Sequence, residues 1–126
     1  MVKGTFSVKS TLNPPIGEAA IGHMSFHKQF EGALEAESVV EMLTVSGNMN
    51  GSAAYVAIER VTGRLQGKAG TFWLHHVGIM KRGEPSLSVQ VVPDSASGEL
   101  EGLSGSMKID ILEGKHFYTF DFAINT

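Results

Sequence analysis

Residues 55–76, YVAIERVTGRLQGKAGTFWLHH, have the pattern of two β-strands joined by a tight glycine turn. We expect Gly67-Lys68 to form a two-residue type II′ turn, because glycine is favoured at the first central position of that turn. This register places Glu59 opposite His76 on one face of the hairpin. A four-residue loop over 67–70 would shift the pairing by two residues and leave every side chain on the same face.

The two faces of this hairpin are both largely apolar, which is not typical of a sheet with one face in water. The first face includes small residues that suit the confined inside of a closed sheet. It comprises Tyr55, Ala57, Glu59, Val61, Gly63, Phe72, Leu74, His76, Gly78 and Met80. The second, bulkier face comprises Val56, Ile58, Arg60, Thr62, Trp73, His75, Val77 and Ile79. We therefore place the Tyr55 face inside a barrel and expect subunits to associate through the Trp73 face.

The rest of the chain repeats this organisation. Turn-forming residues recur about every ten residues between segments of alternating polarity, which is typical of short strands in a sandwich or barrel. We predict an all-β fold: a single antiparallel β-barrel of about eight strands, with residues 1–126 as one domain. Residues 31–43, EGALEAESVVEML, have the composition of a helix, which is the alternative there. The Gly-x-Leu pattern shared by segments starting at Gly32, Gly63 and Gly98 favours a repeated turn and a strand instead.

Composition excludes several classes of protein. The 126 residues suffice for one core without disulfides, and the chain has no cysteine. The net charge is −3 and the basic residues are scattered, so nucleic acid is not an expected partner. No apolar run approaches the roughly 20 residues of a membrane helix, and the N-terminus lacks the apolar segment of a signal peptide. We expect a cytoplasmic protein.

Glu59 and His76 are the candidate catalytic residues, together with Tyr55 on the same face. A carboxylate and an imidazole inside a barrel are costly unless they pair, and such a pair can transfer protons. The alternative is a buried hydrogen-bonded pair with a purely structural role. We expect Phe72, Leu74 and Met80 to line a ligand pocket, with Tyr118 from the aromatic last strand. Lys28 is expected at the barrel rim; the alternative is a buried Lys28 near Glu41.

No metal or cofactor is expected. Adjacent strand residues point to opposite faces, so His75 and His76 cannot share an ion. His23 and His27 would lie about 13 Å apart along a strand, too far to chelate. The zinc-protease, P-loop and dinucleotide motifs are all missing.

Three strings carry a resemblance to a known family: IGHMSFHKQFEGALEAES, GSAAYVAIERVTGRLQGKAGTFWLHHVGIM and VVPDSASGELEGLSGSMKIDILEGKHFYTFDF. Together they resemble a bacterial family of domain-of-unknown-function proteins. The resemblance implies a small, lipocalin-like antiparallel barrel with subunit contacts, grouped with the plant allene oxide cyclases. Those cyclases fold an unstable fatty-acid epoxide for ring closure without a cofactor. The likeness is one of fold, and it transfers no catalytic residue to this chain.

The sequence thus leads to two functional hypotheses. In the first, the barrel binds a small, mostly apolar molecule, with cofactor-free isomerase or cyclase-like chemistry by confinement. Tyr55, Glu59 and His76 would hold or protonate that ligand. In the second, a solidly packed barrel acts as a non-enzymatic binding or interaction protein. Both expect a homodimer or a larger homo-oligomer.

Overall fold

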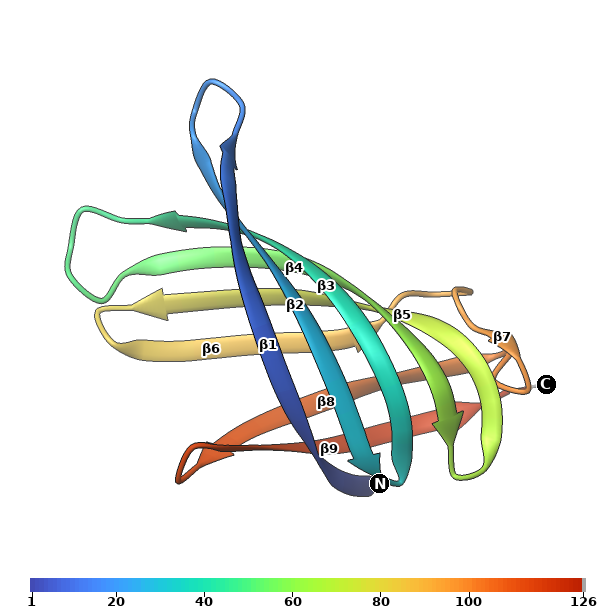
Figure 1. The fold of residues 1–126 in the computed structure, drawn as a ribbon. Helices are drawn as coiled ribbons and strands as arrows, with labels where there is room; N and C mark the ends of the chain where they lie inside the picture. Colours follow the sequence, from blue (N-terminus) through green and yellow to red (C-terminus); the bar gives the residue numbers. More distant parts are fainter. Residues whose placement is uncertain (126) are drawn as a thin grey trace.

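The computed structural model describes residues 1–125, which form an antiparallel sheet that closes on itself (Figure 1). The strand order is β4-β3-β2-β1-β9-β8-β6-β5, and pairing of β4 with β5 completes an eight-stranded barrel; the short β7 is added to β5. This confirms the all-β barrel. The strands are β1 (Val2–Ile16), β2 (Ile21–Gly32), β3 (Leu34–Ser46), β4 (Ala53–Leu65), β5 (Lys68–Lys81), β6 (Glu84–Val91), β7 (Ser97–Gly98), β8 (Leu103–Leu112) and β9 (Lys115–Ile124). Among residues 1–125 there is no helix that could cross a membrane.

Strand β3 replaces the alternative helix over residues 31–43. Its side chains alternate between the inside and the outside of the barrel, with Leu34, Ala36, Ser38 and Val40 buried. Pairing with β2 and β4 on both edges satisfies its backbone. Burial of one face at period two therefore outweighs the helical propensity of its alanine, leucine and glutamate residues.

The β4–β5 hairpin turns one residue earlier than the sequence predicts. Gln66 and Gly67 form the two-residue connection, with φ angles of 48° and 83°. Two positive φ values indicate a type I′ turn, whose twist matches that of the flanking strands. The predicted type II′ turn at Gly67-Lys68 is thus wrong, and the pairing shifts by two residues: Glu59 lies opposite Leu74, and His76 opposite Ala57. An even shift preserves the faces, so the inside and outside sets are correct.

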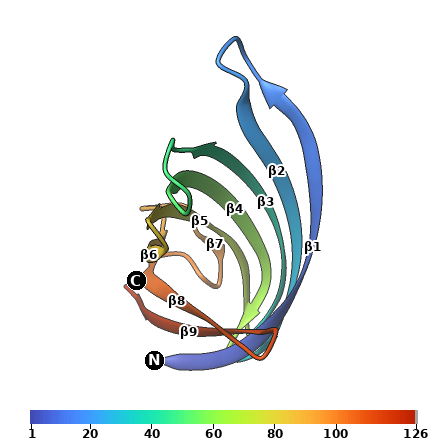
Figure 2. The ribbon, with the colours of Figure 1, turned by 90° about the vertical axis from the view of Figure 1, so that its left-hand side faces the viewer.

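The two ends of the barrel differ. One end holds the core, where Leu34, Leu65, Phe72, Leu100 and Phe120 are almost completely buried. At the other end the hairpins diverge, and the β1–β2 hairpin points away from those of β3–β4, β5–β6 and β8–β9 (Figure 2). Inward-facing apolar side chains at this diverging end are only half-buried; they include Val8, Met24, Phe26 and Met42.

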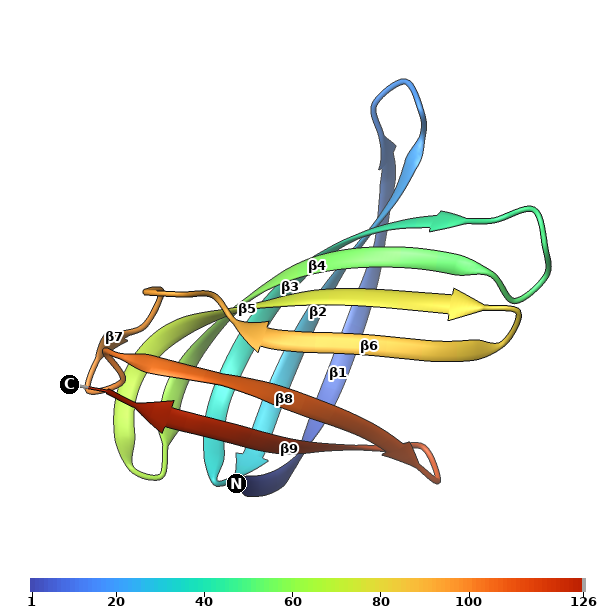
Figure 3. The same ribbon diagram turned by 180° about the vertical axis from the view of Figure 1, so that it is seen from behind.

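The seam between β6 and β8 is the weakest junction of the barrel. Only Gln90 and Ser106 pair across it, whereas β4 pairs with β5 along its whole length. Figure 3 shows β6 and β8 separating from this point toward the diverging end. The barrel is therefore closed, with one seam of minimal hydrogen bonding.

Candidate functional site

Four neighbouring strands bring a polar cluster together inside the barrel. The Glu59 carboxylate of β4 is fully buried. Its Oε1 lies 2.7 Å from His76 Nε2 of β5 and 3.2 Å from Lys28 Nζ of β2, while Ser38 Oγ of β3 donates to Oε2 at 2.6 Å. The predicted pair of Glu59 and His76 is therefore present, although the two residues meet diagonally rather than directly across the ladder. We call Lys28, Ser38, Glu59 and His76 the inner cluster.

The environment of Glu59 holds it in the charged form. Burial acts to raise the pKa of its carboxyl group. The hydrogen bond from His76, the positive charge of Lys28 and the hydrogen bond from Ser38 outweigh burial, so the net effect is a pKa below the ordinary value. Glu59 is thus an ionised carboxylate that accepts from three donors.

Stability should fall in acid because of this carboxylate. In the unfolded chain Glu59 has its ordinary pKa of 4.5, and in the folded protein the value is lower. As the pH drops, the unfolded state takes up the proton first, so the contribution of Glu59 is present above the unfolded pKa and is lost as the pH falls through the folded pKa. Urea unfolding from about pH 7 to about pH 3 measures this. In the Glu59→Gln variant the free energy of unfolding should fall less between these pH values. An identical fall would contradict a lowered pKa of Glu59.

Tyr55 lies on the same face of β4 as Glu59, four residues before it and opposite Gly78 of β5. It is half-buried, and burial raises the pKa of its hydroxyl. Its ring covers Gly78, the residue opposite it on β5. A Cβ atom at Gly78 would lie 2.0 Å from a ring carbon, so only glycine leaves room for the ring there. Within residues 1–125 the Tyr55 hydroxyl makes no hydrogen bond to the cluster, which leaves it available at the diverging end.

The predicted pocket-lining residues occupy different surroundings. Phe72, Leu74 and Tyr118 lie in the packed core, whereas Met80 is 40% exposed at the end of β5. The Tyr118 hydroxyl is hydrogen-bonded to backbone, accepting from Leu34 N at 2.8 Å and donating to Glu31 O at 3.0 Å. It therefore ties β9 to the β2–β3 turn.

Lys28 and Ser38 are the two cluster members that the sequence analysis did not place in the site. Lys28 is not at the rim: its side chain is 9% exposed, and it pairs with Glu59 rather than with Glu41. Its Nζ also lies 4.8 Å from the centroid of the Phe6 ring. Ser38 could have been found from the alternation of β3, since it is the one polar residue among buried apolar ones at that spacing.

Glu41 instead forms an exposed network on the outside of the barrel. Its Oε1 accepts from Ser25 Oγ at 2.5 Å and lies 2.8 Å from His23 Nε2. Asn13 Nδ2 donates to Ser25 Oγ at 2.7 Å. These hydrogen bonds lower the pKa of Glu41. Among residues 1–125, no group of three or more metal-binding side chains is arranged around a common point.

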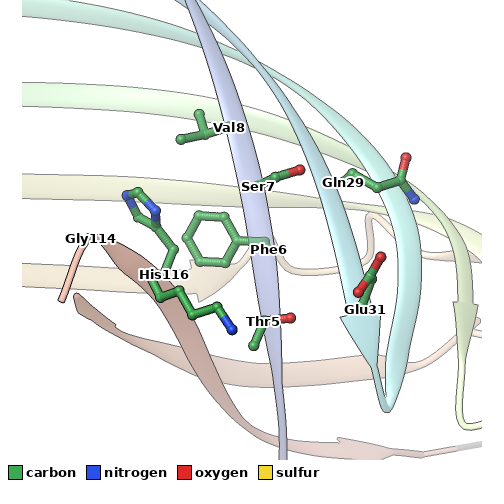
Figure 4. Close-up of a pocket in the computed structure, with 9 residues that line it drawn as sticks. Thr5, Phe6, Ser7, Val8, Gln29, Glu31, Gly114 and His116 are labelled. Atoms are coloured by element: carbon green, nitrogen blue, oxygen red, sulfur yellow. The ribbon is translucent and has the colours of Figure 1, made fainter. Parts of the chain in front are cut away.

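A hollow of about 460 Å³ lies where the β1–β9 ladder ends. Phe6, Val8 and His116 line it from one side, and Gln29 and Glu31 from the other (Figure 4). The rings of Phe6 and His116 are 5.0 Å apart. Phe6 therefore borders this hollow and also contacts Lys28 of the inner cluster.

Comparison with known proteins identifies the family. The profile described as "Protein of unknown function (DUF3224)" matches residues 2–122. The chain is also similar to the crystal structure of a DUF3224 protein of unknown function from Shewanella oneidensis MR-1. The two are 45% identical, with 99% of this chain and 97% of that chain covered and a TM-score of 0.92. No curated protein matched. The protein described here therefore belongs to the DUF3224 family, a bacterial family of β-barrel proteins of unknown function.

Proposed function

We propose that this protein binds a small, mostly apolar molecule at the diverging end of its barrel. One observation carries the proposal: a buried, charged cluster lies beneath half-buried apolar side chains that face inward. A charge buried in a barrel that served only as a scaffold would be costly, and apolar residues of similar size would often stabilise the fold better. Ligand sites, in contrast, combine apolar walls with a few fixed polar groups.

The polar contacts of this ligand would come from Tyr55 and His76, and Glu59 would act through its hydrogen bond to His76. The Tyr55 hydroxyl is free of the cluster and can donate to a ligand oxygen. The imidazole of His76 and the carboxylate of Glu59 share a hydrogen bond and can pass a proton between them. Such a pair would allow cofactor-free rearrangement of the bound molecule. The proposal includes isomerase or cyclase-like chemistry, a likeness to the allene oxide cyclases and a cytoplasmic location.

A second candidate function follows from the opposite end of the barrel. Phe72, Leu74, Tyr118 and Phe120 fill that end, as expected for a packed barrel that acts through its outer surface. This function is non-enzymatic binding of another protein. The two functions differ in whether the diverging end takes up a molecule.

Binding of anilinonaphthalene sulfonate, a dye that fluoresces in apolar sites, separates the two functions. We expect a saturable fluorescence increase with the purified protein. His76→Gln should weaken the affinity about tenfold, which corresponds to one hydrogen bond of about 1.4 kcal/mol. His75→Gln is the matched control, because it makes the same change one residue away on the outer face. Native mass spectrometry of the fresh protein, repeated after denaturation, would show any molecule retained from the cell.

Three outcomes would contradict the ligand site. No saturable dye binding and no retained mass would favour the packed barrel. Unchanged affinity in the His76→Gln variant would place the dye elsewhere. Equal loss in the His75→Gln and His76→Gln variants would assign the dye to the outer face.

A further inference from the structure

The outer face of β3, β4 and β5 exposes a continuous apolar surface. Val56, Ile58 and Ile79 are 51%, 48% and 51% exposed. Val45, Trp73 and Val77 are exposed around them. Single exposed apolar side chains are ordinary, but a contiguous patch of this kind marks an interaction surface.

The same face is hollowed by a groove of about 460 Å³. Apolar residues from four strands line most of it: Ile16 of β1, Leu43 of β3, Val56 and Ile58 of β4, and Val77 of β5. His23, Glu41 and His75 add polar groups. This groove is separate from the hollow near Phe6. It also borders His76, whose imidazole is buried and pairs with Glu59 of the inner cluster.

The strand register places an acidic residue on one side of Ile58 and a basic residue on the other. Glu41 of β3 is its cross-strand neighbour on one side, and His75 of β5 is its neighbour on the other. The next row holds only apolar residues, with Val56 between Leu43 and Val77. This row holds an acid, an apolar residue and a base. A second copy rotated by 180° about the direction of β4 therefore presents its base to the acid of the first copy, and its acid to the base.

We propose that a second copy of this chain docks on this face, with a two-fold axis running along β4. That axis exchanges β3 with β5 between the two copies. Ile58 then meets the partner's Ile58, and Glu41 meets the partner's His75, twice by symmetry. An imidazole N–H donates to a carboxylate whether or not the ring is charged.

The surrounding rows fit the same arrangement. Leu43 meets the partner's Val77, and Val39 meets the partner's Trp73. Ser25 and His23, which extend the rows onto β2, meet the partner's Gln90 and the partner's Ser88 on β6. An apolar centre with a polar rim is the usual anatomy of an interface. Arg60 lies at the end of the patch, where its guanidinium is 6.0 Å from the ring centroid of its own Trp73.

A two-fold axis perpendicular to the strands fits less well. It would place each strand over its own copy, so an axis through the Ile58 row would bring Glu41 against the partner's Glu41 instead of a base. Two carboxylates brought together at an interface repel each other. The axis along β4 is therefore the one that the side chains favour.

Sedimentation velocity and native mass spectrometry test this proposal. The unaltered protein should be a dimer at micromolar concentration. Ile58→Glu should raise the dissociation constant about thirtyfold or more, since it places two carboxylates at the centre of the contact. Trp73→Glu should also give monomers. Leu112→Glu is the matched control, because this residue is 62% exposed on β8, away from the face, and it should remain dimeric.

A charge exchange gives a second test that does not depend on one variant folding well. Glu41→Lys and His75→Glu should each weaken the dimer. The double variant should be restored to within a few-fold of the unaltered protein, because the lysine and the new carboxylate face each other. Three results would overturn the proposal: a monomer at all concentrations, a trimer or another assembly without the two-fold, or a double variant no better than its parents.

Discussion

Glu59→Gln should lower the free energy of unfolding by about 3–5 kcal/mol, the usual cost of removing one partner from a buried ion pair. The change leaves the Lys28 ammonium with 9% exposure and no counter-charge. It also replaces one of the two carboxylate oxygens with an amide donor, so either His76 at Oε1 or Ser38 at Oε2 loses its acceptor. Urea denaturation, followed by Trp73 fluorescence at low protein concentration, measures the loss.

Glu41→Gln is the matched control for this variant. Glu41 contacts a histidine and a serine, as Glu59 does, but its side chain is 55% exposed. An exposed carboxylate of this kind contributes about 1 kcal/mol or less. If the two variants lost similar, small amounts of stability, the inner cluster would not be buried in solution.

If Glu59 and Lys28 form a buried ion pair, a Lys28→Met, Glu59→Leu double variant should be more stable than either single variant, because no lone charge remains inside.

Phe72→Ala should also lower the free energy of unfolding by about 3–5 kcal/mol, the range for removing a core aromatic. Phe72 is 1% exposed, and its ring stacks on that of Phe120 with centroids 6.0 Å apart. Its removal would leave a cavity among residues from both sides of the barrel. Chemical denaturation of Phe72→Ala and of Ile79→Ala, which truncates a half-exposed residue on the same strand, makes the comparison. Ile79→Ala should lose about 1 kcal/mol or less.

The result for Phe72 also bears on the ligand site. A loss below about 1 kcal/mol would mean that Phe72 borders open space rather than core. Phe72 would then line a pocket, as predicted from the sequence. A large loss would restrict the site to the diverging end, with Tyr55 and His76 nearer to the ligand than Phe72.

The fold could be predicted from the sequence because the alternation of side chains and the glycine turns point to the same structure. The inside and outside faces of β4 and β5 were predictable because any even shift of the hairpin conserves them. The register itself was not. Both Gln66-Gly67 and Gly67-Lys68 can form a two-residue turn with glycine, and nothing local indicates that Gln66 adopts a positive φ.

Half of the inner cluster was predictable for a related reason. Glu59 and His76 belong to one hairpin, so their common face follows from local pairing. Lys28 and Ser38 reach Glu59 through the β2–β3 and β3–β4 ladders, across separations of 31 and 21 residues. Their positions beside Glu59 depend on the registers of the β2–β3 and β3–β4 pairs, which no local sequence pattern specifies. The length of Lys28 also allowed two positions, rim or interior, which only the surrounding Phe6 and Phe30 rings decide.

The single bridge between β6 and β8 has a consequence for the motions of the barrel. Backbone amides along this seam have few partners, so they should exchange with deuterium through small local openings, long before those of the β3–β4 and β4–β5 ladders. The residues of the inner cluster all belong to β2–β5, on the continuously paired side. Local opening at the seam would therefore widen the diverging end while Lys28, Ser38, Glu59 and His76 keep their geometry. Under the proposed function, a ligand could then enter without disruption of the inner cluster.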